Sequence, residues 1–175
     1  RLSWNCEGCK KQAAYRIVAV NDSDKILWDT GKVESSQMVH IPWNGCDLKS
    51  RDKVTWKVCL WDEKDELGEW SEEATFEIGL LSKVDWKAKW VTGNYKVNKK
   101  NRYPVDCFRK DFVVEKPVKK ARLYATACGI YEASINGAKC SDFCLAPGIT
   151  DYNKRIQYQT IDVTDQLAQG DNQLT

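Results

Sequence analysis

The stretch from residue 107 to 164 is built from short alternating runs, and no other part of the chain restricts the fold as much. Within FRKDFVV, successive residues alternate between two faces with the period of two that a pleated strand requires. Asn136-Gly137 separates YEASI from AKCSDF, and both residues tolerate the positive φ of a type I′ turn. Ala146-Pro147-Gly148 indicates another reversal. Because no segment shows a sustained helical stripe, the sequence predicts an all-β protein made of antiparallel sandwiches.

The first part of the chain repeats this pattern. Turn residues such as Asn21-Asp22-Ser23-Asp24 separate the runs at roughly the eight-to-twelve-residue spacing of sandwich strands. We expect a fibronectin type III-like or immunoglobulin-like sandwich over residues 1–79, with its first strand missing. The expected strands, after a strand end in RLSW (1–4), are AAYRIVAV (13–20), KILWD (25–29), QMVHIPW (37–43), KVTWKVCLWD (53–62) and GEWSEEATFEI (68–78).

Residues 80–87 are the expected linker between two domains. The linker is short and partly apolar, which favours packed domains over a flexible tether. Residues 88–175 are then a second β-sandwich. The final GDNQLT indicates a turn that enters another strand, so we expect this sandwich to be cut at its C-terminal edge and the chain to be an internal slice of a larger protein.

Composition argues against two classes of partner. A net charge of +2 gives no global attraction to nucleic acid or to a membrane surface. The basic loop from Gly93 to Asp106 has no aromatic-rich basic face beside it, as a nucleic-acid site would. No apolar run approaches the ~20 residues that a membrane helix needs. We therefore expect neither a nucleic-acid nor a membrane partner.

Eight cysteines leave the compartment open. Cys59 and Cys128 lie in strand-like runs, where a reduced cysteine acts as a small hydrophobe. Cys6-x-x-Cys9 has the spacing of a metal or redox motif, but a structural zinc site needs four ligands, and the pair Cys140 and Cys144 lies in the other domain. We therefore favour reduced thiols and a cytoplasmic protein. A secreted or periplasmic protein stays open, because the chain does not start with a natural N-terminus.

Catalytic signatures are missing from the sequence. His40 is the single histidine, and a lone strand histidine more often packs or faces solvent than catalyses. No Ser or Cys nucleophile with an orienting carboxylate is recognisable, and no Gly-rich phosphate loop follows a strand. Carboxylates are plentiful, but nothing selects a pair that would face each other across a glycosidase cleft. The sequence predicts that the chain by itself catalyses nothing.

Ligand binding is better supported than catalysis. An indole or phenol ring offers a broad apolar face on which a sugar can stack, and this chain has eight tryptophans and seven tyrosines. Polar side chains in nearby turns can reach the hydroxyl groups of such a ligand. For any single residue, a place in the core or on a plain surface is the more common role. The sugar-binding candidates are Tyr131, Asn136, Asp151, Tyr152 and Arg155.

The order of the motifs resembles one known family. AYRIVAV, LWDTGKVESS, SRDKVTWKVCLWDE, GEWSEEATFEIGLL and DWKAKW precede FRKDF, ARLYATACGIYEASINGAKCSDFCLAPGITDYNKRIQYQTIDVT and GDNQLT. This set covers essentially the whole chain and looks like the N-terminal region of bacterial α-L-rhamnosidases. The resemblance implies a fibronectin-like domain followed by a jelly-roll sandwich over 88–175. It also implies a downstream (α/α)6 barrel that releases terminal α-L-rhamnose from glycosides and polysaccharides with inversion, so that no catalytic residue falls within this chain.

The resemblance further implies partners and a metal. The jelly roll is similar to carbohydrate-binding modules, and some relatives bind rhamnose there with calcium. A rhamnose-containing glycan and the chain's own downstream catalytic domain are therefore the expected partners, and no cofactor is required. Calcium takes six to eight oxygen ligands, often from carboxylates. The loop candidates for calcium are Asp106, Asp142 and Asn153, with Asp151 as a further carboxylate.

Two other functions stay open at this point. A glycan-binding or adhesion protein without hydrolase activity would continue into further β-modules, whereas the enzyme would continue into a long helical barrel. A glycosidase of different specificity would share the jelly roll and differ in its active site. The sequence downstream would separate all three.

Overall fold

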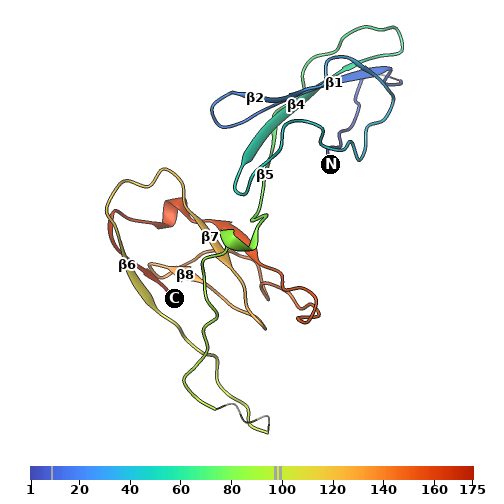
Figure 1. Cartoon of the computed structure of the whole chain (residues 1–175). Coiled ribbons are helices and arrows are strands. Elements are labelled where there is room, and N and C mark those ends of the chain that lie inside the picture. Colours follow the sequence, from blue (N-terminus) through green and yellow to red (C-terminus); the bar gives the residue numbers. More distant parts are fainter. Residues whose placement is uncertain (9, 97, 99) are drawn as a thin grey trace. The chain divides into compact units, whose positions relative to one another are not determined.

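Strands dominate the computed structural model, which describes residues 1–175 except 9, 97 and 99. The chain divides into two compact units, Arg1–Ala88 and Lys89–Thr175 (Figure 1). Within the described residues, the helical elements are two 3-10 turns, η1 (Lys83–Asp85) and η2 (Thr164–Gln166). The all-β prediction is confirmed. The division between the units falls one residue past the predicted linker.

One antiparallel sheet organises the first unit. Its strands follow the spatial order β2-β1-β4-β5, and β3 also pairs with β1. The bounds are β1 Ala14–Val20, β2 Ile26–Asp29, β3 Val33–Glu34, β4 Lys53–Trp61 and β5 Ala74–Glu77. The strands expected at 13–20, 25–29 and 53–62 are confirmed, whereas the one expected at 68–78 is regular only over β5.

Alternation along β1 builds the core of the first unit. Tyr15, Ile17 and Ala19 point to one face and are buried, as the period of two predicts. Tyr15 and Ile17 pack with Val58 of β4, and half-buried aromatic rings including Trp28 surround this cluster. Regular burial on one face of a long strand pair therefore defines this unit.

The run QMVHIPW (37–43) is not a strand, so the prediction there is wrong. His40 has a φ of +58°, a left-handed conformation that interrupts extended backbone. Pro42 has no N–H to donate to a neighbouring strand. Among the described residues, the one β-bridge of this segment joins Ile41 to Leu2, and Met38 O accepts a further backbone hydrogen bond from Trp4 N at 3.0 Å. An alternating pattern alone does not reveal such a backbone turn.

A buried glutamine holds this irregular segment in place. Gln12 is 2% exposed, and its Nε2 donates to the carbonyl oxygens of Ser35 (2.8 Å) and Gln37 (3.2 Å). Its Oε1 accepts a hydrogen bond from Trp4 Nε1 at 2.9 Å. Because a buried amide costs free energy unless it is paired, these three bonds fix the path of the segment.

The segment before Ala88 is attached to the first unit. Ser82 caps η1 by accepting a hydrogen bond from the Val84 N–H. Ser50 Oγ donates to Asp85 Oδ2 (2.6 Å) and accepts from Leu81 N (2.8 Å). The Ser50 hydrogen bond is the main reason that the pKa of Asp85 is lowered. The predicted linker is therefore held by specific bonds to the unit that precedes it.

Two antiparallel sheets form the second unit. One has the order β6-β11-β8-β9, and the other pairs β7 with β10. The bounds are β6 Lys110–Val114, β7 Arg122–Ala125, β8 Ser134–Ile135, β9 Ala138–Lys139, β10 Gln159–Asp162 and β11 Gly170–Leu174. The central strand β11 pairs with β6 from Gly170↔Val114 to Leu174↔Lys110. The strand expected in GDNQLT is confirmed.

The hairpin between β8 and β9 has the predicted turn. Asn136 and Gly137 have φ values of +52° and +81°, as a type I′ turn requires. At Ala146-Pro147-Gly148, the Gly148 N–H donates to the Leu145 carbonyl at 3.1 Å, and the Ala146–Pro147 peptide is cis. Both predicted reversals are confirmed.

The core of the second unit is small. Ile135, Cys140 and Val163 are buried at its centre. Partly buried hydrophobic side chains pack around them, namely Ala121, Leu123, Ala133, Ile161, Leu167 and Leu174. The short strands leave long loops between them, and these loops line the depressions described below.

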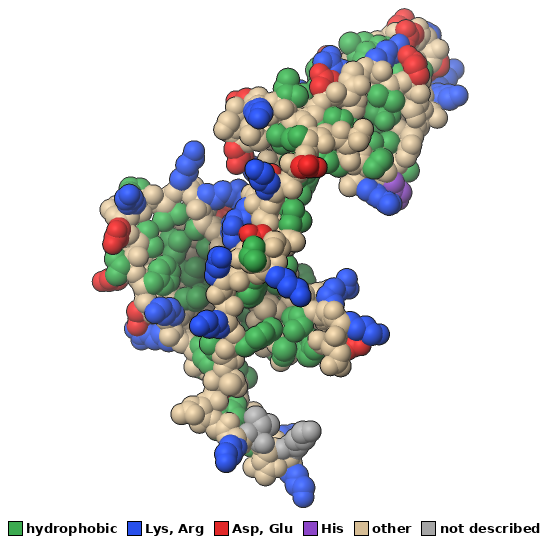
Figure 2. All heavy atoms as spheres, in the orientation of Figure 1, with side chains coloured by type: hydrophobic (Ala, Val, Ile, Leu, Met, Phe, Trp, Pro, Cys, Tyr) green, Lys and Arg blue, Asp and Glu red, His purple; other side chains and the backbone are tan. Residues whose placement is uncertain are grey.

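The surface carries charges of both signs. Positive and negative side chains are interspersed over the face shown in Figure 2, in keeping with a net charge of +2. Within the part of the chain that the structure describes, no helix is long and apolar enough to cross a membrane.

The cysteines differ from the prediction at two positions. Cys6 is disulfide-bonded, so the expectation that all eight thiols are reduced is wrong there, and Cys9 lies outside the described residues. Cys59 is buried in β4 as predicted, whereas Cys128 is exposed and outside the strands. The free cysteines are Cys46, Cys59, Cys107, Cys128, Cys140 and Cys144. The compartment stays a prediction.

Candidate functional site

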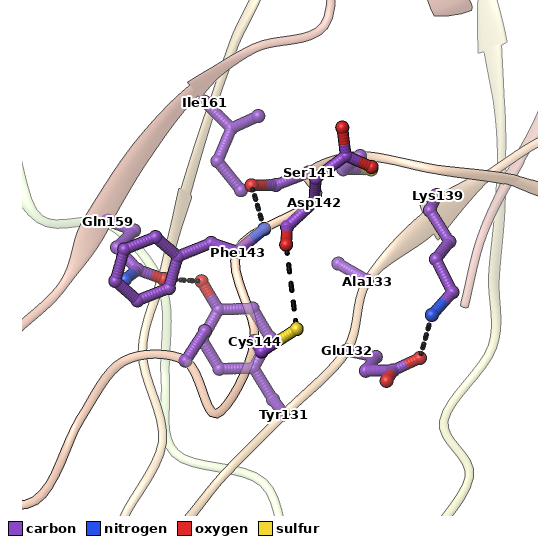
Figure 3. Close-up of a pocket in the computed structure, with 12 residues that line it drawn as sticks. Tyr131, Glu132, Ala133, Lys139, Ser141, Asp142, Phe143, Cys144, Gln159 and Ile161 are labelled. Atoms are coloured by element: carbon purple, nitrogen blue, oxygen red, sulfur yellow. Dashed lines mark hydrogen bonds and ion pairs between the residues drawn. The ribbon is translucent and has the colours of Figure 1, made fainter.

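A pocket of about 250 Å³ opens in the second unit, where the chain around β8 and β9 meets the loop that follows β9 (Figure 3). Residues 131–133, 139–144 and 146 form most of its wall, and Gln159 and Ile161 of β10 complete it. The pocket therefore lies where strands from both sheets of the unit contribute side chains. We call it the β8–β10 pocket.

Tyr131 and Gln159 form the polar part of its wall. The Tyr131 hydroxyl donates to Gln159 Oε1 at 3.0 Å, and the Tyr131 backbone N–H donates to the Ala146 carbonyl at 2.9 Å. Burial is the main cause of the raised pKa of Tyr131, so the phenol stays protonated at neutral pH. This pair offers a fixed amide and a neutral hydroxyl group to a ligand.

An ion pair marks the opposite rim. Lys139 Nζ lies 3.0 Å from Glu132 Oε2, and both side chains are exposed to solvent. The hydrogen bond to Glu132 is the main cause of the raised pKa of Lys139. An exposed pair of this kind contributes little to stability, so both groups can exchange partners with a polar ligand.

The loop after β9 closes the pocket. Ser141 Oγ accepts a hydrogen bond from the Phe143 N–H at 3.0 Å, and Cys144 Sγ donates to the Asp142 carbonyl at 3.7 Å. The Phe143 side chain is 63% exposed, an unusual position for a phenyl ring. Cys140 is buried behind the loop, and its burial raises the pKa of its thiol. This cysteine is therefore a packing residue and not a nucleophile.

The structure brings together only some of the predicted site residues. Tyr131 and the predicted calcium ligand Asp142 both line the β8–β10 pocket. Asn136 lies in the hairpin turn, where its Nδ2 donates to Gln166 O (3.0 Å) and Asn172 Oδ1 (2.9 Å). Its Oδ1 accepts from the Gln173 N–H at 2.9 Å, so this side chain already has three protein partners.

The remaining sugar candidates lie together in the loop before β10. Asp151 Oδ1 accepts from the Asn153 N–H (3.1 Å), and the Asp151 carbonyl accepts from the Arg155 N–H (2.9 Å). Tyr152 is 38% exposed, and the Asp151 and Arg155 side chains also face solvent. Sequence reasoning thus placed these three in one loop, and their contact with a ligand stays a prediction.

The three predicted calcium ligands have separate partners. Asp106 accepts hydrogen bonds from the Tyr95 hydroxyl (3.0 and 3.1 Å), Asn153 bonds to Asp151, and Asp142 lies in the pocket wall. Among the described residues, no three His, Cys, Asp or Glu side chains gather in a group that could hold a metal ion. The residues as placed do not form one ligand set, and calcium binding stays a prediction.

Sequence reasoning missed most of the residues that line the pocket. Gln159, Lys139, Glu132 and Phe143 were not among the candidates, because their convergence depends on the register of β10 and on the path of one loop. The sequence signal that could have identified Phe143 is an aromatic residue placed between polar and turn residues in SDFCLAPG, where a core role is disfavoured.

A second depression, of about 460 Å³, lies over β6 and β11. It is lined by Arg109, Asp111, Phe112, Val113, Asn136, Asp171, Asn172 and Gln173. Both depressions are lined by hydrogen-bonding side chains and by apolar side chains. This chemistry suits binding of a hydroxylated molecule better than bond cleavage.

Two family models match the chain. Residues 1–82 match the Rha78A-like N-terminal immunoglobulin domain, and residues 116–175 match the α-L-rhamnosidase N-terminal domain. The first match agrees with the immunoglobulin-like form of the sandwich predicted for the first unit.

Curated relatives carry the same family name. An α-L-rhamnosidase of Formosa agariphila is 40% identical over 98% of this chain and 20% of its own length. An α-L-rhamnosidase of Alteromonas sp. (strain LOR) is 36% identical over 94% of this chain and 19% of its own length. The chain thus spans about one fifth of the length of the relatives it matches.

Solved structures agree with the sequence matches. The α-L-rhamnosidase of Dictyoglumus thermophilum has a TM-score of 0.80 and 36% identity, over 94% of this chain and 20% of that one. The α-L-rhamnosidase of Aspergillus terreus has a TM-score of 0.84 and 34% identity, over 98% of this chain and 20% of that one. Fold, family models and relatives agree, and this chain belongs to the α-L-rhamnosidase family, where it corresponds to the N-terminal domains.

Proposed function

We propose that this chain is the non-catalytic N-terminal region of an α-L-rhamnosidase. In the parent protein, a separate downstream (α/α)6 barrel removes terminal α-L-rhamnose from glycosides or polysaccharides with inversion. The observation that supports this proposal is the extent of the similarity, which covers 94–98% of this chain but only about one fifth of relatives with that name. The other four fifths of those relatives lie outside the matched region.

The chemistry of the β8–β10 pocket supports a non-catalytic role. An inverting glycosidase needs two carboxyl groups roughly 6.5–9.5 Å apart, one of them a protonated acid. The pocket carboxylates are Glu132, which is ion-paired with Lys139, and Asp142. The Tyr131 hydroxyl is already bonded to Gln159, and the Cys140 thiol is buried. The polar groups of the pocket therefore suit binding of a hydroxylated ligand.

Hydrolysis assays on the full-length parent test the catalytic proposal. We expect release of the chromophore from an aryl α-L-rhamnoside and at least ~10-fold slower release from aryl β-D-glucoside and α-L-arabinofuranoside controls. Proton NMR of the first product should show β-L-rhamnose, the inverted anomer. Preference for another glycoside would favour a glycosidase of different specificity, and no hydrolysis of any substrate would favour the glycan-binding alternative.

We also propose that the β8–β10 pocket contacts the glycan. The exposed Phe143 ring can stack on the apolar face of a pyranose, while Gln159, Lys139 and Asp142 can bond to its hydroxyl groups. This proposal does not depend on the catalytic one, because a glycan-binding protein without hydrolase activity would use the same groups.

Titration calorimetry of the parent with a rhamnose-containing oligosaccharide tests this contact. Phe143→Ala should weaken binding by about fivefold, since one aromatic contact is worth about 1 kcal/mol. Leu81→Ala in the first unit is the matched control, because Leu81 is 65% exposed and lines neither depression. Equal affinities of the wild type and both variants for the oligosaccharide would show that the glycan does not contact Phe143.

A further inference from the structure

The basic loop from Gly93 to Asp106 lies in a stretch of the chain that carries charge of one sign. From Trp86 to Val105 the sequence has six Lys or Arg residues and no Asp or Glu, although the whole chain has 25 acidic residues. The loop projects away from the two sheets of the second unit (Figure 1), and Lys and Arg side chains extend from its far end (Figure 2). A net charge of +2 therefore conceals a local region of positive potential.

Two stacked tyrosine rings give this loop a structure of its own. The rings of Tyr95 and Tyr103 lie nearly parallel, with an interplanar angle of 20° and centroids 5.0 Å apart. The Tyr103 hydroxyl accepts a hydrogen bond from Asn98 N (2.7 Å) and donates one to the Lys96 carbonyl (3.4 Å). Asn98 Oδ1 accepts a hydrogen bond from Lys100 N at 3.0 Å. These hydrogen bonds hold the backbone that carries Lys96 and Lys100.

The cations of the loop lack acidic partners. Among the described residues, no carboxylate forms an ion pair with Lys96, Lys100 or Arg102, and all three are exposed. The carboxylate of Asp106 is held by the Tyr95 hydroxyl, which lies 3.0 and 3.1 Å from its two oxygens. Because like charges repel, three exposed cations without counter-charges favour the binding of an anionic molecule.

We propose that the basic loop binds an acidic polysaccharide, in which carboxylate or sulfate groups recur along the chain. Lys96, Lys100 and Arg102 pair with these anionic groups. The exposed parts of the Tyr95 and Tyr103 rings, which are 44% and 39% exposed, contact the apolar faces of its pyranose rings. The inference rests on the proposed function, because it assigns a class of polysaccharide to the parent glycosidase.

A polysaccharide fits the loop better than nucleic acid, the other common polyanion. Proteins bind single-stranded nucleic acid by stacking successive bases on aromatic rings along a positively charged groove. In this loop the Tyr95 and Tyr103 rings stack on each other, so one face of each ring is already covered. The proposed function also gives the parent protein a glycan as its substrate. We therefore assign the loop to an acidic glycan and include nucleic acid in the test.

Affinity electrophoresis of the full-length parent in polymer-containing gels tests this surface. The probes are polygalacturonate with its methyl-esterified form, and dextran sulfate with uncharged dextran. At least one acidic polymer should bind ~10-fold or more tightly than its uncharged counterpart, and the two pairs show whether carboxylate or sulfate is preferred. Binding should weaken as the salt concentration rises from about 50 to about 200 mM, because salt screens exposed charges. Equal retardation within both pairs, or tighter binding of single-stranded DNA than of any polysaccharide, would overturn the inference.

Two triple variants separate the loop from the charge of the whole protein. Replacing Lys96, Lys100 and Arg102 together with alanine should weaken binding of the preferred polymer at least ~10-fold, since each ion pair contributes up to about 1 kcal/mol. The control replaces three exposed lysines of the first unit, Lys25, Lys64 and Lys83, with alanine. It removes the same charge and should weaken binding by at most ~2-fold.

The comparison of these variants also keeps the inference apart from the proposed function. Equal weakening by both triple variants would overturn the inference, because attraction to the whole protein would then explain the binding. Unchanged binding by the loop variant would overturn it as well, even if the parent hydrolyses α-L-rhamnosides. A parent that binds the acidic polymer through the loop but hydrolyses no α-L-rhamnoside would instead overturn only the proposed function.

Discussion

The two units are held together by different means. The first has a nine-residue central strand and completely buried apolar side chains such as Ile17 and Val54. The second has strands of two to five residues and only three buried hydrophobic residues in its core cluster. Seven of the eight tryptophans lie in residues 1–88 and six of the seven tyrosines in residues 89–175. Regular burial of side chains therefore defines the first unit, whereas in the second unit the loops between short strands form the pockets.

Side-chain amides replace part of the missing apolar packing in the second unit. Asn172 is 4% exposed, and its Nδ2 donates to the carbonyls of Ala168 (2.7 Å) and Gly170 (2.9 Å). Its Oδ1 accepts from Ala168 N and from Asn136 Nδ2, both at 2.9 Å. This network connects the β8–β9 hairpin to the turn before β11. We expect it to contribute to the stability of the second unit as the buried Ile17 side chain contributes to that of the first.

Ile17→Ala should have the largest effect. Ile17 is 0% exposed in the centre of β1, so the substitution leaves a cavity and should lower the free energy of unfolding of the first unit by about 3–4 kcal/mol. Urea unfolding followed by tryptophan fluorescence reports on this unit. Val113→Ala, at an exposed position of the second unit, should change the same transition by less than ~0.5 kcal/mol.

Asn172→Ala should destabilise the second unit by about 2–3 kcal/mol. The change leaves buried backbone groups and the Asn136 amide without their partner, which costs more than the lost bonds alone. Near-ultraviolet circular dichroism of the tyrosines follows this transition. Asn153→Ala in an exposed loop is the control. A loss below ~1 kcal/mol for Asn172→Ala would mean that the network is not what holds the second unit.

Tyr131→Phe should cost the second unit about 1 kcal/mol. The substitution keeps the ring but removes the 3.0 Å hydrogen bond to Gln159, and a typical bond of this kind is worth about that much. The same circular dichroism transition measures the change. Tyr152→Phe is a matched control on an exposed ring, and its effect should be close to zero. Equal effects of Tyr131→Phe and Tyr152→Phe on stability would mean that the Tyr131 hydrogen bond does not stabilise the second unit.

The Arg16–Asp29 pair should give the smallest effect, in the first unit. The hydrogen bond from Arg16 holds the pKa of Asp29 at about 2, below its ordinary value of 3.8. Ionised Asp29 therefore stabilises the folded state above pH 4, and this contribution is lost as the pH falls toward 2. Because both side chains are partly exposed, it amounts to at most ~1 kcal/mol.

Acid unfolding followed by tryptophan fluorescence measures this contribution. The wild type should lose slightly more stability between pH 4 and pH 2 than Asp29→Asn, which cannot titrate at this position. Identical pH profiles for the two proteins would show that the pair contributes nothing to the first unit.

The regular parts of the fold could be predicted from the sequence. The period-two patterns predicted β1 and β4, and Asn136-Gly137 predicted the β8–β9 hairpin. These elements could be predicted because they depend on local conformation and on burial of one face. The strand predicted at residues 37–43 is absent because the left-handed backbone of His40 and the hydrogen bonds from Gln12 override the alternating pattern. Neither feature has a local signal.

The pocket could be predicted only in part for a related reason. Tyr131 was identified as a ring in a turn-rich stretch, but its partner Gln159 is 28 positions away and meets it only through the register of β10. The sequence predicted that the Asn136 amide binds a ligand, whereas in the structure this amide is hydrogen-bonded to Asn172 and Gln173. A polar side chain that the sequence places in a turn can thus have a structural role, because residues far away in the sequence form hydrogen bonds with it in the folded protein.

The most direct measurement compares the full-length parent with residues 1–175 in one assay. Both proteins, at equal molar concentration, are incubated with a chromogenic α-L-rhamnoside, and circular dichroism confirms that the shorter protein is folded. We expect the parent to release the chromophore and the folded shorter protein to release none above the buffer rate. Release by residues 1–175 alone would contradict the account, because it would place catalytic groups within these two units.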